Sequence, residues 1–354
     1  MIWYVVVPML KVGGGNIEAI QLGRELAETG GEARMLCMWE TQHPLKSELG
    51  VEHLISKITS ARRALLDLPS LLMRFRRFAS EAMAAGTAAG FVFTHYSTLP
   101  LALLVPGRKR FYFVQDLEWH FIGFGPASRL LRAVILSCYR RGRVLSANSY
   151  LTSALCKHGV NVEAEVPIWA NAAFLSSGAE RRDIDFIMVL RTGAHKRLDL
   201  YRSFVELARK QPTLRLAVIS PDDALIAEFR DHVAVAVLRP SLDQMRELYS
   251  RSKCFVHLSE HEGFGLPPLE AMGAGCVPLC RDSGGVRAFM SSAPASSLLI
   301  PLDTPVESLL ARAQAVTAGD QWQGLSDASR EIFRRGLDRT RGRAKELARI
   351  MARS

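Results

Sequence analysis

Short, almost purely apolar runs alternate with longer amphipathic stretches from the start of the chain. In the first half the apolar runs are IWYVVVPM, EARMLCM, GFVFT, RFYFVQ and RVLSAN. Helical periodicity lies between them, for example over residues 16–29 and 128–140. Strands that are apolar on both faces are typical of a parallel sheet with helices on both sides. The first half therefore predicts a doubly wound domain.

A second series of the same kind begins near Asp183. Its apolar runs are DIDFIMVL, LRLAVIS, VAVAVL, KCFVHL and CVPLC. The segment VPIWANAAFLSSGAERRD separates the two series and has the composition of a linker. We therefore expect an α/β protein of two Rossmann-like domains that face each other across a cleft, over residues 1–168 and 184–335, with a linker over 169–183. Residues 336–354 are predicted to form a helix that packs back on the first domain.

One uncharged stretch, from Glu81 to Arg108, is long enough to span a bilayer. Glycine, histidine and proline interrupt it, so a helix end, a buried strand, a loop and a second helix explain it better. The chain begins with a strand-like run and without the basic segment of a signal peptide. Its six cysteines are scattered and form no C-x-x-C pair, which indicates a reducing compartment and argues against zinc. We expect a cytoplasmic protein.

Charge narrows the choice of partners. The 354 residues include 45 Lys and Arg against 35 Asp and Glu, a net charge of +10, which favours anionic partners. Two basic amphipathic segments, residues 60–77 and 129–143, suit helices lying on an anionic bilayer. Surface helices with snorkelling arginines explain them equally well. The arginines accompany no nucleic-acid-binding motif, so we expect no nucleic acid.

The sharpest chemical signal is the segment SEHEGFGLPPLEAMGAGCVP, residues 259–278. It follows an apolar run and opens a helix at its Pro-Pro pair. Gly263 and Gly265 let the backbone approach a ligand closely, and amides at a helix start suit a diphosphate. Glu262 precedes the loop, and Glu270 lies one turn into the helix, where a carboxylate can accept both hydroxyls of a ribose. An ordinary strand–loop–helix turn with a solvated glutamate is the alternative.

Basic residues lie near the start of the second domain, in the segment VLRTGAHKRLD. Arg191 ends the strand and Lys196 precedes a helix, so both point to the carboxyl end of the sheet, where open α/β folds bind ligands. An ordinary exposed basic loop would have the same sequence pattern. The two cations indicate a ligand site because the chain also contains the glutamate loop.

A glycine loop, Gly13, Gly14 and Gly15, follows the first strand. Dinucleotide-binding folds use a similar loop, but the G-x-G-x-x-G fingerprint fails because its last position is Glu18. Glu40 does follow the second strand, where a ribose-binding acid would lie, so a dehydrogenase-like protein stays open as an alternative.

The motif E-G-F-G-L-P-P-L-E, followed by A-M-G-A-G, resembles the retaining glycosyltransferases of family 4, the group 1 enzymes with the GT-B fold. The resemblance covers most of the chain. It includes the triple-glycine loop, the Arg191 and Lys196 pair, Ser259, and the Gly284-Gly285 pair. The stretch FYFVQDLEWHFIGFG, followed by SCYRRGRVLSANSYLTSAL, is similar to a rhamnosyltransferase-like subgroup.

The resemblance implies roles for these residues. Arg191 and Lys196 would neutralise the donor diphosphate, and Glu270 would hold the nucleotide ribose. Glu262 would face the donor sugar. The glycine loop would close over the donor from the first domain. The remaining donor-binding candidates form the loop itself: Gly263, Phe264, Gly265 and Leu266.

The implied chemistry is front-face substitution with retention, in which the leaving phosphate takes the proton of the acceptor hydroxyl. The transition state is oxocarbenium-like, so cations and oriented amides are the largest catalytic term available. The resemblance implies no cofactor and no metal, and the chain has no Asp-x-Asp motif.

Three positions depart from the family pattern. Where the family often has a histidine this chain has Gln115 and Asp116, so Asp116 and the nearby His95 are the candidates for its role. Arg197 stands where glycine is usual, and adds a phosphate contact or narrows the pocket. Ala288 stands where a glutamate is expected, which removes one donor-side contact.

For the acceptor, Trp119, His120 and Phe121 are the local candidates, because aromatic faces stack on sugar rings. Core packing is the alternative for all three. His261, beside Glu262, is more simply a loop residue than a catalyst.

The sequence thus predicts a metal-independent, retaining hexosyltransferase. Its partners would be a nucleotide-sugar donor (dTDP-rhamnose, or a UDP- or GDP-sugar) and a glycan or lipid-linked acceptor in polysaccharide or lipopolysaccharide synthesis. Peripheral contact with the inner face of the plasma membrane is part of the same hypothesis. An inactive relative and a sugar-nucleotide epimerase share the architecture. The intact set of Arg191, Lys196, Glu262 and Glu270 argues against the inactive relative.

Overall fold

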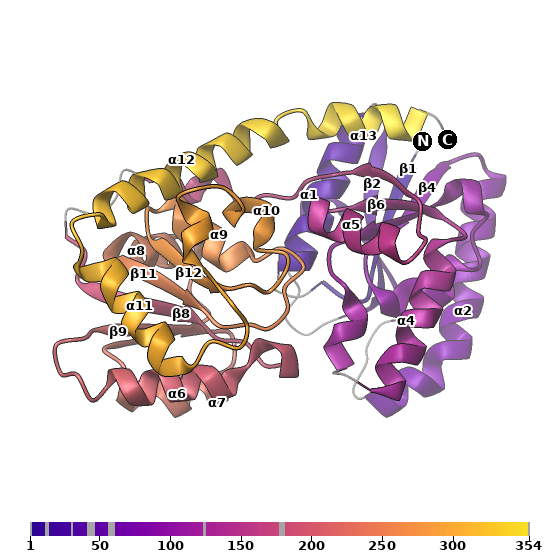
Figure 1. Cartoon of the computed structure of the whole chain (residues 1–354). Helices are drawn as coiled ribbons and strands as arrows, with labels where there is room; N and C mark the ends of the chain where they lie inside the picture. The colour runs from indigo at the N-terminus through magenta and orange to yellow at the C-terminus, as the bar shows by residue number, and fades with distance from the viewer. Residues whose placement is uncertain are drawn as a thin grey trace. The chain divides into compact units, whose positions relative to one another are not determined.

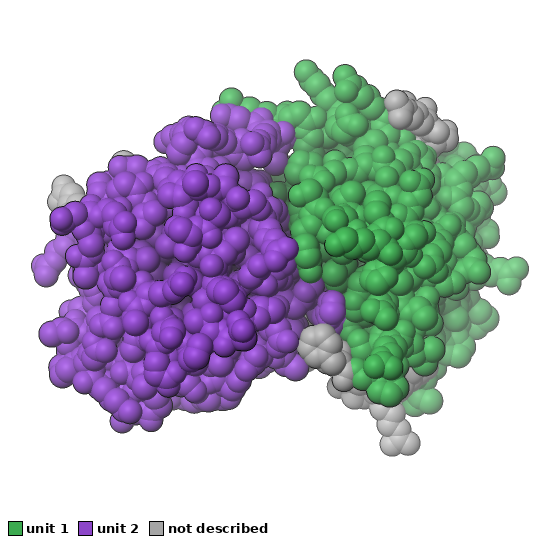
Figure 2. Space-filling view, in the orientation of Figure 1, with its two compact units in different colours: residues 1–119, 124–168, 341–354 green, residues 120–123, 169–340 purple. Residues whose placement is uncertain are grey.

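The computed structural model describes two compact units, coloured separately in Figure 2. Unit 1 comprises residues 1–119, 124–168 and 341–354, and unit 2 comprises residues 120–123 and 169–340. Within them the structure describes residues 2–10, 14–29, 31–40, 47–55, 61–122, 125–176 and 181–352. Each unit is built on one parallel sheet, so the predicted fold of two Rossmann-like domains is confirmed.

The sheet of unit 1 has seven strands in the order β3-β2-β1-β4-β5-β6-β7 (Figure 1). They are β1 (Ile2–Val7), β2 (Glu32–Trp39), β3 (Gly50–Ile55), β4 (Ala88–Phe93), β5 (Arg110–Val114), β6 (Arg143–Ser146) and β7 (Val162–Glu165). The helices are α1 (Gly14–Glu28), α2 (Ala61–Ala84), α3 (Leu99–Ala102), α4 (Pro126–Tyr139), α5 (Ser149–Lys157) and α13 (Arg343–Ala352). Short 3-10 helices lie at Tyr96–Thr98, Gly107–Lys109 and Glu118–Ile122.

The central strands of unit 1 are buried on both faces, which explains their unbroken apolar sequences. Every residue of β5 is buried, and β1 is buried from Trp3 to Val7. The two edge strands, β3 (GVEHLI) and β7 (VEAE), contain polar residues and are largely exposed or half-buried, and the apolar pattern did not predict them. The uncharged stretch after Glu81 forms the end of α2, then β4 and α3, as predicted. Among the described helices, none combines the length and apolarity needed to cross a membrane.

The strand order of unit 1 reverses between β1 and β4. The crossovers from β1 to β3 run toward one edge of the sheet, and those from β3 to β7 run toward the other. Because such crossovers are right-handed, α1 covers one face and α2 to α5 cover the opposite face. The loops after β1 and β4 diverge at this reversal, which is where open α/β sheets bind ligands.

The sheet of unit 2 has six strands in the order β10-β9-β8-β11-β12-β13. They are β8 (Ile184–Val189), β9 (Leu216–Ser220), β10 (Val235–Leu238), β11 (Ser252–His257), β12 (Val277–Arg281) and β13 (Leu299–Ile300). The helices are α6 (Leu198–Ala208), α7 (Asp223–Phe229), α8 (Leu242–Arg251), α9 (Leu266–Gly273), α10 (Arg287–Met290), α11 (Val306–Ala318) and α12 (Trp322–Thr340). Short 3-10 helices lie at Ala172–Phe174, Ala194–Lys196, Arg230–His232 and Ala295–Leu298.

In unit 2 the strand order reverses between β8 and β11. Figure 1 shows α6 and α7 on one side of the sheet and α8, α9 and α12 on the other, as right-handed crossovers require. The loops that follow β8 and β11 therefore start side by side. These two loops carry the Arg191/Lys196 and Glu262/Glu270 motifs.

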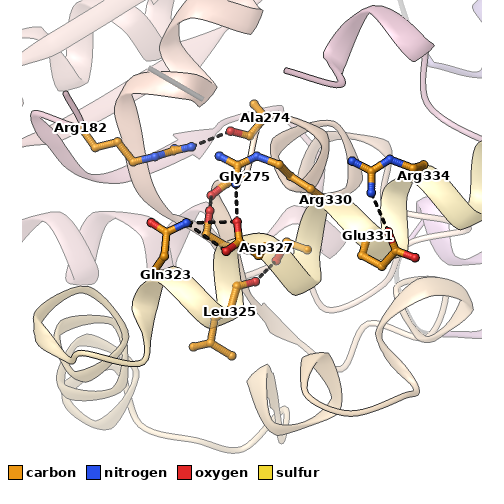
Figure 3. Close-up of polar contacts among 11 residues, drawn as sticks. Arg182, Ala274, Gly275, Gln323, Leu325, Asp327, Arg330, Glu331 and Arg334 are labelled. Carbon is orange, nitrogen blue, oxygen red and sulfur yellow. Dashed lines mark hydrogen bonds and ion pairs between the residues drawn. The ribbon is translucent and has the colours of Figure 1, made fainter. Parts of the chain in front are cut away.

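Helix α12 holds the carboxyl end of α9. The Ser326 hydroxyl donates to the Gly275 carbonyl at 2.7 Å. Arg182, which precedes β8, donates to the Ala274 carbonyl at 2.6 Å (Figure 3). The Arg330 side chain lies over Gly275. Cations at this end favour the helix dipole of α9. Because of these contacts α12 stays with unit 2 up to Thr340, whereas the sequence placed the change of unit after residue 335.

The last helix, α13, packs on α1 in unit 1, as predicted. Its Arg343 is almost fully buried and pairs with two carboxylates of α1, Glu18 at 3.1 Å and Glu25 at 2.8 Å. Burial raises the pKa of both carboxyls, and Arg343 opposes that rise. One guanidinium thus balances two buried acids.

Replacing Arg343 with methionine should destabilise unit 1 by about 3–5 kcal/mol, because two buried acids lose their shared cation. The deficit should shrink as the pH falls, since the orphaned carboxyls then take up protons. Urea unfolding at two pH values measures it. Arg349→Met is the matched control, because Arg349 lies on the same helix but is exposed. An equal loss of stability in both variants would contradict this account.

Candidate functional site

A close ion pair joins the loops that follow β8 and β11. Lys196 Nζ lies 2.9 Å from Glu262 Oε1, and the two side chains are 18% and 14% exposed. The backbones of the loops also meet, because the Glu260 amide donates to the His195 carbonyl at 2.8 Å. The structure therefore brings together two residues that the sequence separates by 66 positions.

The ion pair fixes the charge of Glu262. Burial alone would raise the pKa of this carboxyl, but the Lys196 ammonium and a hydrogen bond from Ser259 outweigh it and lower the pKa to about 2. His257 Nε2 lies 3.4 Å from the same carboxylate oxygen. Burial and the nearby ammonium lower the pKa of His257 to about 4, so its ring is neutral at pH 7. Lys196 is thus the cation that keeps Glu262 ionised.

The position of Glu262 is set by backbone packing against the Gly284-Gly285 turn. The Glu262 amide donates to the Ser283 carbonyl, and its carbonyl accepts from the Gly285 amide, both at 2.9 Å. A Cβ on Gly285 would lie only 2.3 Å from the carbonyl carbon of Gly263. Only glycine allows this approach.

Helix α9 begins at Gly265, whose φ of +94° lies in the left-handed region that favours glycine. Because Pro267 and Pro268 have no N–H, this helix start offers an anion the amides of Gly265 and Leu266. The Phe264 ring packs against Trp169 and Phe289, so only its backbone can serve a ligand.

Glu270 lies one turn into α9 and has a different charge state from Glu262. Burial raises the pKa of Glu270 to about 7, against the lowering effects of the Arg191 charge and of a hydrogen bond from Tyr249. The Tyr249 hydroxyl lies 3.4 Å from Glu270 Oε2. Arg191 itself is exposed after β8. The site therefore combines a permanently ionised carboxylate with one that titrates at neutral pH.

Arg197 adopts a left-handed backbone conformation, with φ +53° and ψ +51°. This conformation explains why glycine suits the position. Its guanidinium bonds Asp199 at 2.7 Å and lies 3.5 Å from Glu260, so the side chain is committed to carboxylates rather than to an added phosphate contact. Ala288 lies in α10 and is partly buried.

In unit 1, the predicted residues follow three neighbouring strands. Gly14 and Gly15 begin α1 after β1, and Gln115 donates to the Gly15 carbonyl at 3.2 Å. Gly13 lies outside the described residues. His95 follows β4, and its Nδ1 accepts from the Ser97 amide at 3.2 Å.

Glu118 is a candidate that sequence reasoning missed. It is buried, and its Oε1 lies 3.7 Å from His95 Nε2. Burial and the charge of Asp116 raise the pKa of Glu118 well above its ordinary value. Asp116 itself accepts from the Leu117 amide at 2.7 Å. The signal in the sequence was the pair of acids two residues apart, directly after a buried strand.

The aromatic candidates for the acceptor have different environments. Trp119 is buried in unit 1, and its ring packs edge-on against His158, which favours the core-packing alternative. His120 and Phe121 belong to unit 2. The His120 ring lies 4.5 Å from that of His261, and the Phe121 ring stacks on His195 at 5.4 Å.

The segment that carries this site is similar in sequence to known proteins. Residues 173–300, which lie within unit 2, match the family model described as glycosyl transferases group 1. A GDP-mannose:cellobiosyl-diphosphopolyprenol alpha-mannosyltransferase from Komagataeibacter xylinus is 26% identical over 176 residues, 42% of this chain and 44% of the relative. The matched segment thus spans less than half the length of that relative.

Solved structures are similar over nearly the whole chain. Sucrose-phosphate synthase from Thermosynechococcus elongatus has a TM-score of 0.81 at 15% identity, covering 99% of this chain and 98% of the other. HepE from Anabaena, in complex with UDP-glucose, has a TM-score of 0.74 at 13% identity, covering 98% and 99%. The protein has the GT-B fold, and part of its second unit, residues 173–300, is similar to the glycosyl transferases group 1.

Gly285→Ala should destabilise unit 2 by about 1–3 kcal/mol, because the added Cβ meets backbone atoms that cannot move independently of the Glu262 loop. Thermal unfolding measures the change. Gly324→Ala, at an exposed position of α12 with open space around it, should instead stabilise by up to about 1 kcal/mol. If Gly285→Ala left the stability unchanged, the Glu262 loop would not depend on close packing against the Gly284-Gly285 turn.

Proposed function

We propose that the protein is a retaining hexosyltransferase that moves a sugar from a nucleoside diphosphate donor to a glycan or lipid-linked glycan. The observation that carries the proposal is the Lys196–Glu262 ion pair beside Arg191 and Glu270, inside the segment that is similar to the glycosyl transferases group 1.

Donor recognition follows from the charges in unit 2. Arg191 offers a planar fork to phosphate oxygens. Lys196 has three donors, of which Glu262 uses one. The amides of Gly265 and Leu266 complete the diphosphate site, and Glu270 accepts from the ribose hydroxyls.

The reaction we propose breaks the bond between the anomeric carbon and the leaving phosphate and forms a bond to the acceptor oxygen on the same face. The acceptor proton goes to the leaving phosphate. Glu262 stays ionised and faces the positive charge that develops on the sugar. Arg191 and Lys196 balance the departing phosphate, so the proposed reaction needs no metal.

We assign the acceptor to unit 1, where His95, Asp116 and Glu118 gather beyond the carboxyl ends of β4 and β5. The glycine loop, Gly13 to Gly15, is proposed from the sequence to bind the donor. The relative from Komagataeibacter xylinus is named for a GDP-mannose donor and a diphosphopolyprenol-linked acceptor. We therefore favour a lipid-linked glycan as the acceptor, and a rhamnosyl donor rests on the sequence resemblance.

The nucleotide assignment predicts a clear pattern of ligand stabilisation. A nucleoside diphosphate at about 100 times its dissociation constant should stabilise the protein by about 2.7 kcal/mol. Glu270→Ala should abolish this shift, because it removes the ribose acceptor. Glu262→Ala should retain the shift and lose sugar transfer. Thermal melts with UDP, GDP, TDP, CDP and NAD, together with a transfer assay, test both statements.

Glu331→Ala, on the outer face of α12, is the control and should behave as the wild type. Stabilisation by NAD alone would contradict the proposal and support a dehydrogenase-like protein. Stabilisation without transfer to any acceptor would support an inactive nucleotide-sugar-binding relative.

We also propose peripheral contact with an anionic membrane, such as the inner face of the plasma membrane, through α2 and α4. These helices cover the same face of the unit 1 sheet. On these helices Leu66, Met73 and Leu130 are 74%, 69% and 68% exposed. Exposed arginines flank them, among them Arg76, Arg77 and Arg129. Apolar residues set among cations suit the interface of an anionic bilayer.

Vesicles that contain anionic lipid should therefore bind the protein, and added salt should weaken binding steeply. The double variant Met73→Gln, Leu130→Gln should bind less tightly. Leu242→Gln, at an exposed leucine of unit 2, is the control and should bind normally. Sedimentation with vesicles measures binding, and binding that ignores both salt and the double variant would contradict the proposal.

A further inference from the structure

Tyr249 is a fully buried tyrosine whose hydroxyl faces Glu270. It lies on α8, and its ring packs against Phe174 and Phe255 with ring centres 5.8 and 5.9 Å apart. A buried tyrosine hydroxyl needs a polar partner. Here it donates to Glu270 Oε2, and no other side chain in the described part of the molecule hydrogen-bonds that carboxyl.

We propose that Tyr249 is a positioning residue for the donor ribose, and that binding of the donor releases a proton from Glu270. Tyr249 would hold one carboxyl oxygen in place and leave the other to the ribose. The inference rests on the proposed function, because it takes the ligand of Glu270 to be a nucleoside diphosphate sugar.

The charges around Glu270 explain why it holds a proton before the ligand arrives. Arg191, from the end of β8, is the cation that faces it, and Tyr249 faces it from α8. Cys276 lies near Tyr249, and burial raises the pKa of this thiol to about 12, so it is uncharged. Two further cations lie near the carboxyl end of α9. Arg182, before β8, donates to the backbone carbonyls of Tyr249 and Ala274, and Arg330 of α12 lies over Gly275. Neither of them contributes to the pKa shift of Glu270.

Burial therefore dominates at Glu270. It raises the pKa to about 7, so the protonated form of this carboxyl is populated at neutral pH.

A ribose changes this balance because its hydroxyls are donors. A protonated carboxyl presents its own O–H to them, whereas a carboxylate accepts from both. The donor diphosphate opposes the effect, since it neutralises part of the Arg191 charge. Arg191 is exposed and screened by water, while hydrogen bonds to an ionised group are roughly twice as strong as neutral ones. Binding of the ribose therefore favours the ionised form of Glu270, and the carboxyl releases its proton.

The sign of the pH dependence follows. The bound complex has a lower carboxyl pKa than the free protein, so affinity is complete above the free pKa and falls as the pH drops through about 7. Below that point the dissociation constant should rise by up to about tenfold per pH unit. Tyr249 favours the ionised form, so its loss should move the midpoint to higher pH.

Titration calorimetry with UDP-glucose and with GDP-mannose, from about pH 6 to about pH 8.5, tests the inference. These sugar nucleotides are the right probes because the terminal phosphate of a free nucleoside diphosphate titrates near pH 6. Measurements in two buffers of different ionisation enthalpy give the protons released. The wild type should release a fraction of a proton at pH 7 and a larger fraction at lower pH.

Three variants separate positioning from mere packing. Tyr249→Phe keeps the ring and should move the midpoint upward, with binding weakened several-fold at pH 7 and close to wild type at the highest pH. Glu270→Gln should bind weakly with no pH dependence. Tyr112→Phe, a buried tyrosine of unit 1, should match the wild type.

Binding that releases no proton and does not vary with pH would overturn the inference while leaving the proposed function intact. The same holds if Tyr249→Phe weakens binding equally at every pH, which is the result of a packing defect. If neither sugar nucleotide binds the wild type at any pH and no other nucleotide stabilises it, the proposed function itself fails.

Discussion

The ammonium of Lys196 determines the charge of the site in unit 2. Without it, Glu262 would be a buried acid with a raised pKa and a neutral histidine as its neighbour. With it, the carboxylate is ionised across the whole physiological range. The pair is possible because β8 and β11 are adjacent at the point where the strand order reverses, so their loops start side by side. The strand order thus brings Lys196 close to Glu262, and this closeness keeps the carboxylate ionised.

The fold and most of the site's components could be predicted from sequence, because each depends on a local pattern. Strands buried on both faces have no polar residues, so the central strands of both sheets were readable. The edge strands β3 and β7 could not be predicted in this way, since their polar, exposed residues interrupt the apolar pattern. The Glu262 loop was readable because its glycines, prolines and glutamates are close together in the chain.

The unpredicted features all depend on contacts between distant segments. Glu118 becomes a candidate only once β4 and β5 bring His95 within 3.7 Å of it. Trp119 resembled a sugar-stacking residue until its burial placed it in the core. The change of unit after Thr340 follows from contacts that α12 makes with the end of α9, which no periodicity reveals.

Two glutamates of one short segment thus have opposite behaviour, and the difference lies in their partners rather than in their burial. Glu262 faces a partly buried ammonium at 2.9 Å, whereas Glu270 faces a tyrosine hydroxyl and an exposed arginine. Neighbouring carboxyls whose pKa values are pushed apart in this way can take separate tasks. A fixed charge suits a group that must face a developing cation, and a titrating group suits one that must exchange a proton for a ligand's hydroxyls. The helix between them keeps the two tasks apart, because α9 begins at Gly265 and places Glu270 a full turn beyond the loop.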